Sequence, residues 1–276
     1  MVIYNKYIVG YCTYLLYLHV STTFIKHKIT HSCMPKAAKR KFREYTTEKF
    51  KTKHGVFDEF TNRTLFKLIT EGHFEGLESP INIGKESNVF SAIAKEGHRV
   101  IVKIYRLETC DFNIMHSYIK DDPRYANLKD KKRKVILAWV QREYRNLMNA
   151  RDAQVSVPIP IAFLNNILVL EFIGKNADIA PMLKDKIPKN KKEFFEKIVE
   201  NMRKLYKAGL VHADLSAFNI LNFEEAPVFI DMSQATVLRH PRAEEFLTRD
   251  VRNVCVFFKK IGLKVNEKNV MRKIIS

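Results

Sequence analysis

The stretch LVHADLSAFNIL, residues 210–221, places four polar side chains inside a mostly apolar segment. They are His212, Asp214, Ser216 and Asn219. An acid and an amide buried among aliphatic residues cost free energy unless a partner satisfies them. Asp214 and Asn219 therefore indicate a site for a polar ligand, and other parts of the chain must complete it.

Two charges upstream also lie in apolar surroundings. In RVIVKIY, residues 99–105, the alternation of a strand puts Lys103 on the same face as apolar neighbours. Glu143 shares a helical stripe with Trp139 and Leu147, which lie four residues before and after it. An unpaired buried charge is very costly, so the pattern predicts an ion pair between Lys103 and Glu143. The alternative is two surface charges whose stems alone are buried.

A second carboxylate follows the apolar run in EAPVFIDMSQAT, residues 225–236. With it, Asp214, Asn219 and Asp231 offer the oxygen ligands that Mg²⁺ prefers. Asn219 and Asp231 would hold the metal, while Asp214 could accept a hydroxyl proton. Protein kinases combine an Asp and an Asn five apart, a later Asp-led triplet, a strand lysine and a helix glutamate. The chain supplies all of these parts, with the lysine and the glutamate ahead of the three others.

The periodicity of the chain outlines the elements around these residues. Helices are expected over residues 56–74, ending near Gly72, and over residues 134–151, 191–209 and 240–262. Strands are expected at 88–94 and 99–105, joined by a turn at 95–98, at two segments of 155–174 around Asn165-Asn166, and in 225–236 up to Asp231. The polar segment 107–133 is expected to be an irregular loop.

This order predicts an α+β, two-lobed, protein-kinase-like fold. A helix and a small antiparallel-sheet lobe with one main helix would occupy residues 56–174. A reduced, mostly helical lobe would occupy residues 175–276, with the boundary near Gly174.

The charge of the chain is strongly positive, at +18 over 276 residues. Such a surplus favours polyanionic partners, although a solvated basic surface is the alternative. Residues 34–55 form a basic arm that is expected to be mobile and to contact RNA through phosphates.

Residues 1–33 form an apolar leader, and three interpretations of it are open. It could be a signal peptide or a marginal membrane helix, or translation could begin at Met34. The last is favoured, so no membrane contact is expected. The four cysteines are far apart in the sequence, which is typical of a reducing, cytoplasmic compartment.

Several motifs together resemble the RIO family of atypical serine/threonine protein kinases. They are GKESNVF, VIVKIYR, REYRNL, VLEFIG, LVHADLSAFNIL, FIDMSQA and HPRAEEFLTRDVRN, spread over residues 56–262. The resemblance is best to the first subfamily in its archaeal form. It implies an ATP-dependent enzyme that acts on pre-ribosomal particles in maturation of the small subunit.

The resemblance also implies roles for individual residues. Asp214 would be the catalytic base, and Asn219 and Asp231 would bind Mg²⁺, with Mn²⁺ as a substitute. Lys103 would orient the ATP phosphates, with Glu143 holding it. Further nucleotide contacts are implied at Gly84, Lys85, Glu86, Ser87, Asn88, Val89, Glu171, Ile173 and Ser216, with the backbone of Glu171 and Ile173 meeting adenine.

The resemblance further implies that Asp231 can accept phosphate and give an ATPase cycle. Residues 232–240 are too short for an activation loop, which makes ordinary protein phosphorylation doubtful. Thr109 and Ser117 are candidate autophosphorylation sites. Two alternatives stay open: a small-molecule phosphotransferase, such as an aminoglycoside kinase, and a nucleotide-gated RNA-binding scaffold with little turnover.

Overall fold

The computed structural model describes residues 57–125 and 131–276. The apolar leader 1–33 and the basic arm 34–55 lie outside the described residues. Within those residues, no helix combines the length and the apolar character needed to cross a membrane.

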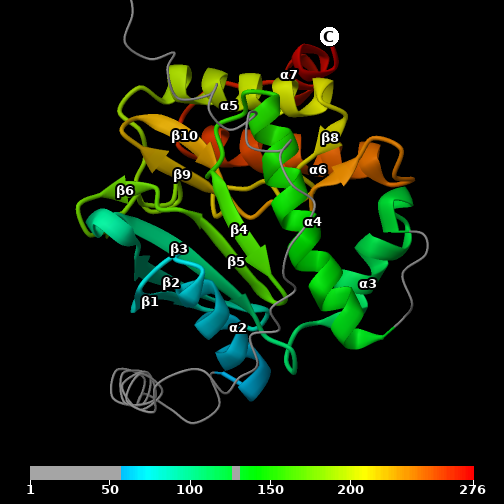
Figure 1. Ribbon diagram of the computed structural model, residues 1–276. Coiled ribbons are helices and arrows are strands. Elements are labelled where there is room, and N and C mark those ends of the chain that lie inside the picture. The colour runs from blue at the N-terminus through cyan, green and yellow to red at the C-terminus, as the bar shows by residue number, and fades with distance from the viewer. Residues whose placement is uncertain (1–56, 126–130) are drawn as a thin grey trace, which may run out of the picture. The chain divides into compact units, whose positions relative to one another are not determined.

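A five-stranded antiparallel sheet with the order β1-β2-β3-β5-β4 forms the first lobe (Figure 1). Its strands are β1 (Gly76–Ile83), β2 (Ser87–Ile93), β3 (Arg99–Tyr105), β4 (Pro160–Leu164) and β5 (Ile167–Glu171). The central strand β3 is buried from Val100 to Tyr105, because it lies between β2 and β5 in the sheet and α4 packs on the neighbouring strands β5 and β4. The turn at 95–98 is present as a short 3-10 helix, Lys95–Gly97.

Strand β1 was missed by the sequence reasoning. It is an edge strand that contains Pro80, and its pairing with β2 has two register shifts. Most of its later residues are exposed or only partly buried, so it lacks the clean alternation of a half-buried strand.

Two helices flank this sheet. Helix α2 (Glu59–Thr70) begins at Asp58, whose side chain accepts a hydrogen bond from the N–H of Thr61. Helix α4 (Lys132–Asp152) packs along β4 and β5, as Figure 1 shows. Both confirm predicted helices, with slightly different ends.

The prediction of an irregular loop over 107–133 was wrong in part. Helix α3 (Phe112–Lys120) begins at Asp111, and its buried residues Met115 and Ile119 face α4. A 3-10 turn, Pro123–Tyr125, follows. Helix α3 is amphipathic, but it has only nine residues and lies inside a polar, charged segment. Its packing on α4 supplies the stability that so short a helix lacks in isolation.

The second lobe contains α5 (Lys191–Lys207), α6 (Ala243–Lys260) and α7 (Glu267–Ile275). Helix α7 was not predicted; it packs on α5 and α6 (Figure 1). Three two-stranded sheets complete the lobe: β6 (Gly174–Lys175) with β7 (Asp178–Ile179), β8 (Leu210–Val211) with β11 (Thr236–Val237), and β9 (Ile220–Phe223) with β10 (Ala226–Phe229).

These small sheets fix the two loops that carry Asp214 and Asp231. One loop runs from β8 to β9, and the other runs from β10 to β11. The predicted strand in 225–236 is thus β10, which ends two residues before Asp231. The α+β class is confirmed, whereas the domain boundary near Gly174 stays a prediction.

Candidate active site

The predicted ion pair between Lys103 and Glu143 is present. Lys103 Nζ lies 2.8 Å from Glu143 Oε1 and 3.0 Å from Asp231 Oδ1. The hydroxyl of Tyr105 donates to the other carboxylate oxygen of Glu143. Burial lowers the pKa of Lys103, but Asp231 and Glu143 outweigh it and hold that pKa well above its ordinary value. Lys103 is therefore a fixed cation that joins the two lobes.

Asp231 lies two residues after β10 and has an unusual backbone conformation. Its φ is +59°, a left-handed conformation that non-glycine residues rarely adopt and that is concentrated at functional sites. Partial burial raises its pKa, but the Lys103 ammonium and a 2.7 Å hydrogen bond from Ser233 Oγ lower it to about 2. The carboxylate is ionised at neutral pH, and its side chain is 42% exposed, so it can meet a ligand.

Asp214 and Asn219 are joined directly. Asn219 Nδ2 donates to the backbone oxygen of Asp214 at 2.8 Å and to its Oδ2 at 3.1 Å. This use of the NH₂ group orients the carbonyl oxygen of Asn219 as the ligand atom. Burial and the negative charge of Asp231 raise the pKa of Asp214, although Arg249 and Asn219 oppose the shift.

His212 is a buried neutral histidine. Its Nε2 lies 3.1 Å from the oxygen of Ile230, so it joins the two loops just before their acids. Burial lowers its pKa to about 4. It therefore acts as a hydrogen-bonding spacer here.

Asp250 on α6 holds the backbone on both sides of Asp214, and the sequence reasoning missed it. Its two carboxylate oxygens accept hydrogen bonds from the N–H groups of Ala213 at 2.8 Å and Leu215 at 2.9 Å. Ala213 has a φ of +64°, so this anchor holds a strained backbone on either side of Asp214. The signal was available: Asp250 lies four residues after Phe246 and four before Val254, the stripe argument that identified Glu143.

The proposed nucleotide loop is shorter than predicted. Ser87, Asn88 and Val89 belong to strand β2, because they pair with β3 opposite Tyr105, Ile104 and Lys103. Only Gly84, Lys85 and Glu86 form the loop, which is closed by a 3.0 Å hydrogen bond from the N–H of Gly84 to the oxygen of Ser87. A Cβ added at Gly84 would lie 3.0 Å from that oxygen, so glycine suits the close turn.

Glu86 faces the acids of the site. Burial and the charge of Asp231 raise its pKa, while Lys103 opposes the shift. Glu86 is thus within electrostatic reach of the groups that would meet a nucleotide.

The structure shows where the remaining predicted nucleotide-binding residues lie, and their binding roles stay predictions. The N–H of Glu171 donates to Ile159 at 2.8 Å, and the oxygen of Ile173 accepts from Ala180 at 2.8 Å, so these two groups already have protein partners. Ser216 Oγ accepts from the N–H of Phe218 at 3.3 Å.

The oxygen set fits Mg²⁺. In residues 57–125 and 131–276, no cluster of three or more His, Cys, Asp or Glu side chains could hold a metal by itself. Mg²⁺ is usually held by one or two carboxylates together with substrate phosphates and water, so Asp231 and Asn219 suffice as its protein ligands. They would hold it while the nucleotide supplies the remaining oxygens.

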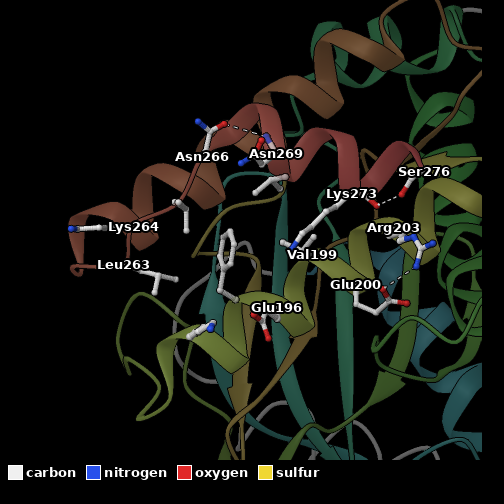
Figure 2. A pocket seen from close by; sticks show the side chains of 14 residues that line it. Glu196, Val199, Glu200, Arg203, Leu263, Lys264, Asn266, Asn269, Lys273 and Ser276 are labelled. Atoms are coloured by element: carbon white, nitrogen blue, oxygen red, sulfur yellow. Dashed lines mark hydrogen bonds and ion pairs between the residues drawn. The ribbon is translucent and has the colours of Figure 1, made fainter.

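A groove of about 740 Å³ opens elsewhere, between α5 and the chain after α6 (Figure 2). Its lining includes Val199, Arg203 and Lys273, and none of its residues belongs to the loops that carry Asp214 and Asp231. The candidate active site is therefore located by its charged residues, and this groove is a separate feature.

Comparison with known proteins defines the class. A protein-kinase-like fold is shared with the crystal structure of the Rio2 kinase-ADP/Mg²⁺-phosphoaspartate complex from Chaetomium thermophilum. The TM-score is 0.58 at 23% identity, covering 76% of this chain and 65% of that one. The chain thus spans less than two thirds of that structure, and the likeness concerns the fold.

The sequence comparison is more specific. Residues 88–271 match the RIO domain. The RIO-type serine/threonine-protein kinase Rio1 of Haloferax volcanii is 43% identical over 215 residues, covering 78% of this chain and 74% of the relative. Rio1 of Methanocaldococcus jannaschii is 41% identical over 228 residues, covering 82% and 78%. The chain belongs to the RIO family of serine/threonine-protein kinases, and the predicted resemblance to the first subfamily is confirmed.

Family membership implies ATP and Mg²⁺ as the nucleotide and the metal, and it favours the kinase over the small-molecule phosphotransferase. Two hydroxyls named as autophosphorylation candidates have hydrogen-bond partners: Thr109 donates to Lys85 at 2.9 Å and Ser117 to Ile114 at 2.8 Å. Their modification stays a prediction.

Proposed function

We propose that this kinase transfers the γ-phosphoryl group of ATP with Asp214 as the base, and that Asp231 can itself accept the phosphoryl group. The observation that carries the proposal is the contrast between the two acids. Lys103 and Ser233 lower the pKa of Asp231 to about 2, whereas burial and Asp231 raise the pKa of Asp214. Two carboxyl groups whose pKa values are pushed apart are typical of divided acid–base roles.

The phosphoryl step is chemically balanced. A carboxylate oxygen of Asp231 forms a bond to the γ-phosphorus, the bond between that phosphorus and the β–γ bridging oxygen breaks, and ADP leaves. Water then attacks the acyl phosphate and releases inorganic phosphate and the Asp231 carboxylate, while Asp214 accepts the proton of the water. A protein hydroxyl that takes the place of water gives a phosphoserine or phosphothreonine.

The wider role is also a proposal. The +18 charge and the basic arm support contact with rRNA on the pre-ribosomal small subunit in the cytoplasm. A nucleotide-gated RNA-binding scaffold with little turnover stays an alternative, since RNA binding alone needs no chemistry.

The test uses γ-labelled ATP with magnesium and the full chain. Wild type is expected to retain label that hydroxylamine removes, and Asp231→Asn is expected to retain none, because hydroxylamine cleaves acyl phosphates. Asp214→Asn is expected to abolish turnover. Label that resists hydroxylamine and stays on serine in Asp231→Asn would contradict the phospho-aspartate and leave a hydroxyl-directed kinase.

A further inference from the structure

A buried amide on α4 holds the loop that follows Asp231. Asn146 is fully buried, and its Nδ2 donates to the oxygen of Met232 at 2.9 Å and to that of Ala235 at 2.7 Å. One NH₂ group therefore fixes both ends of the segment 232–235. This segment begins at the residue after the metal-binding acid, so its position sets where Asp231 can point.

One turn earlier, a buried arginine reaches the middle of the same loop. Arg142 is fully buried, and its Nη2 donates to the oxygen of Gln234 at 3.3 Å. The side chain of Gln234 in turn reaches Asp214 Oδ2 at 3.5 Å. The contacts that hold this loop therefore continue through Gln234 to Asp214, the proposed base.

The orientation of the Asn146 amide is set from the segment before α4. Arg124 Nη1 donates to Asn146 Oδ1 at 2.8 Å, so the NH₂ group must face residues 232–235. Asp122, fully buried, holds Arg124 by a 2.7 Å contact and Arg142 by a 3.3 Å contact. Asp122 and Arg124 thus link Arg142 to Asn146, and these two residues both hold residues 232–235, so the four side chains and the loop backbone together close a ring.

The same segment grips the nucleotide loop at its other end. The N–H of Arg106 donates to the oxygen of Glu86 at 2.9 Å, and the Cys110 thiol contacts that oxygen at 3.0 Å. Thr109 Oγ1 donates to the oxygen of Lys85 at 2.9 Å. Residues 106–110 thus touch one side of the ATP site, and residues 122–124 reach the other through α4.

We propose that Asp122, Arg124, Arg142 and Asn146 are positioning residues for magnesium binding. They contact neither nucleotide nor metal; they hold residues 232–235 so that Asp231 meets the ion with its carboxylate already placed. The proposal deepens the proposed function and rests on its assignment of Asp231 as a metal ligand. The competing explanation is a ring that only stabilises the fold, although apolar residues can often replace buried ion networks without loss of stability.

The test separates these explanations by measuring nucleotide binding with and without metal. Binding of a fluorescent ADP analogue to the full chain is titrated with magnesium and, separately, measured in EDTA. Asn146→Leu keeps the approximate volume but leaves two carbonyls without donors. The matched control is Asn149→Leu, an exposed position on the same helix.

Asn146→Leu is expected to raise the magnesium concentration for half-saturation by about tenfold or more, the factor that follows from losing buried hydrogen bonds. The affinity in EDTA is expected to change by less than about twofold, as is every constant of Asn149→Leu. Equal loss with and without metal, or no loss in folded protein, would overturn the positioning role.

Two further variants allow the proposal to be tested even if Asn146→Leu does not fold. Arg124→Gln, at a side chain that is 21% exposed, removes the group that orients Asn146 and is expected to shift the magnesium requirement in the same direction even if Asn146→Leu fails to fold. Asp231→Asn in the same titration isolates the metal assignment. If Asp231→Asn leaves the requirement unchanged, the proposed function is wrong; if it raises the requirement and Arg124→Gln does not, only the ring is wrong.

Discussion

The two lobes place their charged groups by different means. Lys103 and Glu143 sit in the middle of a regular strand and a regular helix, where backbone periodicity alone aims their side chains. Asp214 and Asp231 sit on loops between two-residue and four-residue strands, with positive φ at Ala213 and Asp231. The loops are held by side chains from distant helices, namely Asp250 on α6 and Asn146 on α4.

This difference teaches where each half of the site is vulnerable. The first half depends on a charge pair, so removing one partner leaves the other buried without compensation. The second half depends on a few buried hydrogen bonds, so small polar substitutions away from the chemistry can displace the acids.

The largest effect is expected from breaking the charge pair. Lys103→Met should lower phosphoryl transfer by about 10²–10³-fold, the range for losing one group that stabilises developing charge. It should also lower the free energy of unfolding by about 3–5 kcal/mol, because Glu143 stays buried without its cation. Phosphate release and chemical denaturation measure the two effects.

The double variant Lys103→Met/Glu143→Gln sharpens this result. It should recover much of the lost stability but none of the activity, since the unpaired charge is gone and the lysine is still absent. Lys120→Met, at an exposed lysine of α3, serves as the control. Stability that stays low in the double variant would contradict the uncompensated-charge explanation.

An intermediate effect is expected in the pH dependence of stability, where two buried groups oppose each other. Burial lowers the pKa of His212 from 6.5 to about 4. The contribution of its neutral ring to the free energy of unfolding is therefore complete above pH 6.5 and is lost as the pH falls towards 4. Burial raises the pKa of Asp250 to about 7, despite its hydrogen bonds to Ala213 and Leu215. Ionising Asp250 therefore costs stability as the pH rises from about 4 to 7.

Single substitutions should separate these opposing slopes. In wild type, His212 makes the free energy of unfolding rise between pH 4 and 6.5, and His212→Gln should remove this rise. Asp250 makes the free energy of unfolding fall between pH 4 and 7, and Asp250→Asn should remove this fall. Each is on the order of 3 kcal/mol across the range, from 1.36 kcal/mol per pKa unit. Denaturant midpoints measured from pH 4 to 8 check this, with His98→Gln showing the effect of removing an exposed histidine. Parallel curves for all three variants would contradict it.

The smallest effect is expected at the contact between α2 and the sheet. Asn166, fully buried in the turn between β4 and β5, donates to Thr61 Oγ1 at 2.9 Å. Thr61→Val should lower the free energy of unfolding by about 1–2 kcal/mol, because a buried donor loses its acceptor. Its kinetic constants should stay unchanged, since no residue of the site is touched.

Thr70→Val on the same helix is the matched control, because that hydroxyl is exposed and bonds only within α2. A change in nucleotide affinity in Thr61→Val would show that α2 influences the site. The placement of Lys103 and Glu143 would then depend on more than the strand and the helix that carry them.

The fold was predictable wherever the chain repeats a period. Strands β2 and β3 and helices α2, α4, α5 and α6 each carry an apolar stripe over several turns or alternations. Strand β1 was missed because an edge strand with Pro80 shows little alternation. Helix α3 was missed because its nine amphipathic residues lie inside a polar, charged segment. Their formation depends on neighbours that lie far away in the sequence.

The sequence by itself singled out the candidate groups for the chemistry. Lys103, Glu143, Asp214, Asn219 and Asp231 are polar residues in apolar segments, at spacings typical of a kinase. It also predicted the pairing of Lys103 with Glu143, because a buried charge without a partner is very costly. Only the tertiary structure decided what holds the acids in place. Asp122 and Asn146 are 24 residues apart in the sequence, and Asn146 lies 86 residues from Met232, so their ring exists only after the lobes have packed.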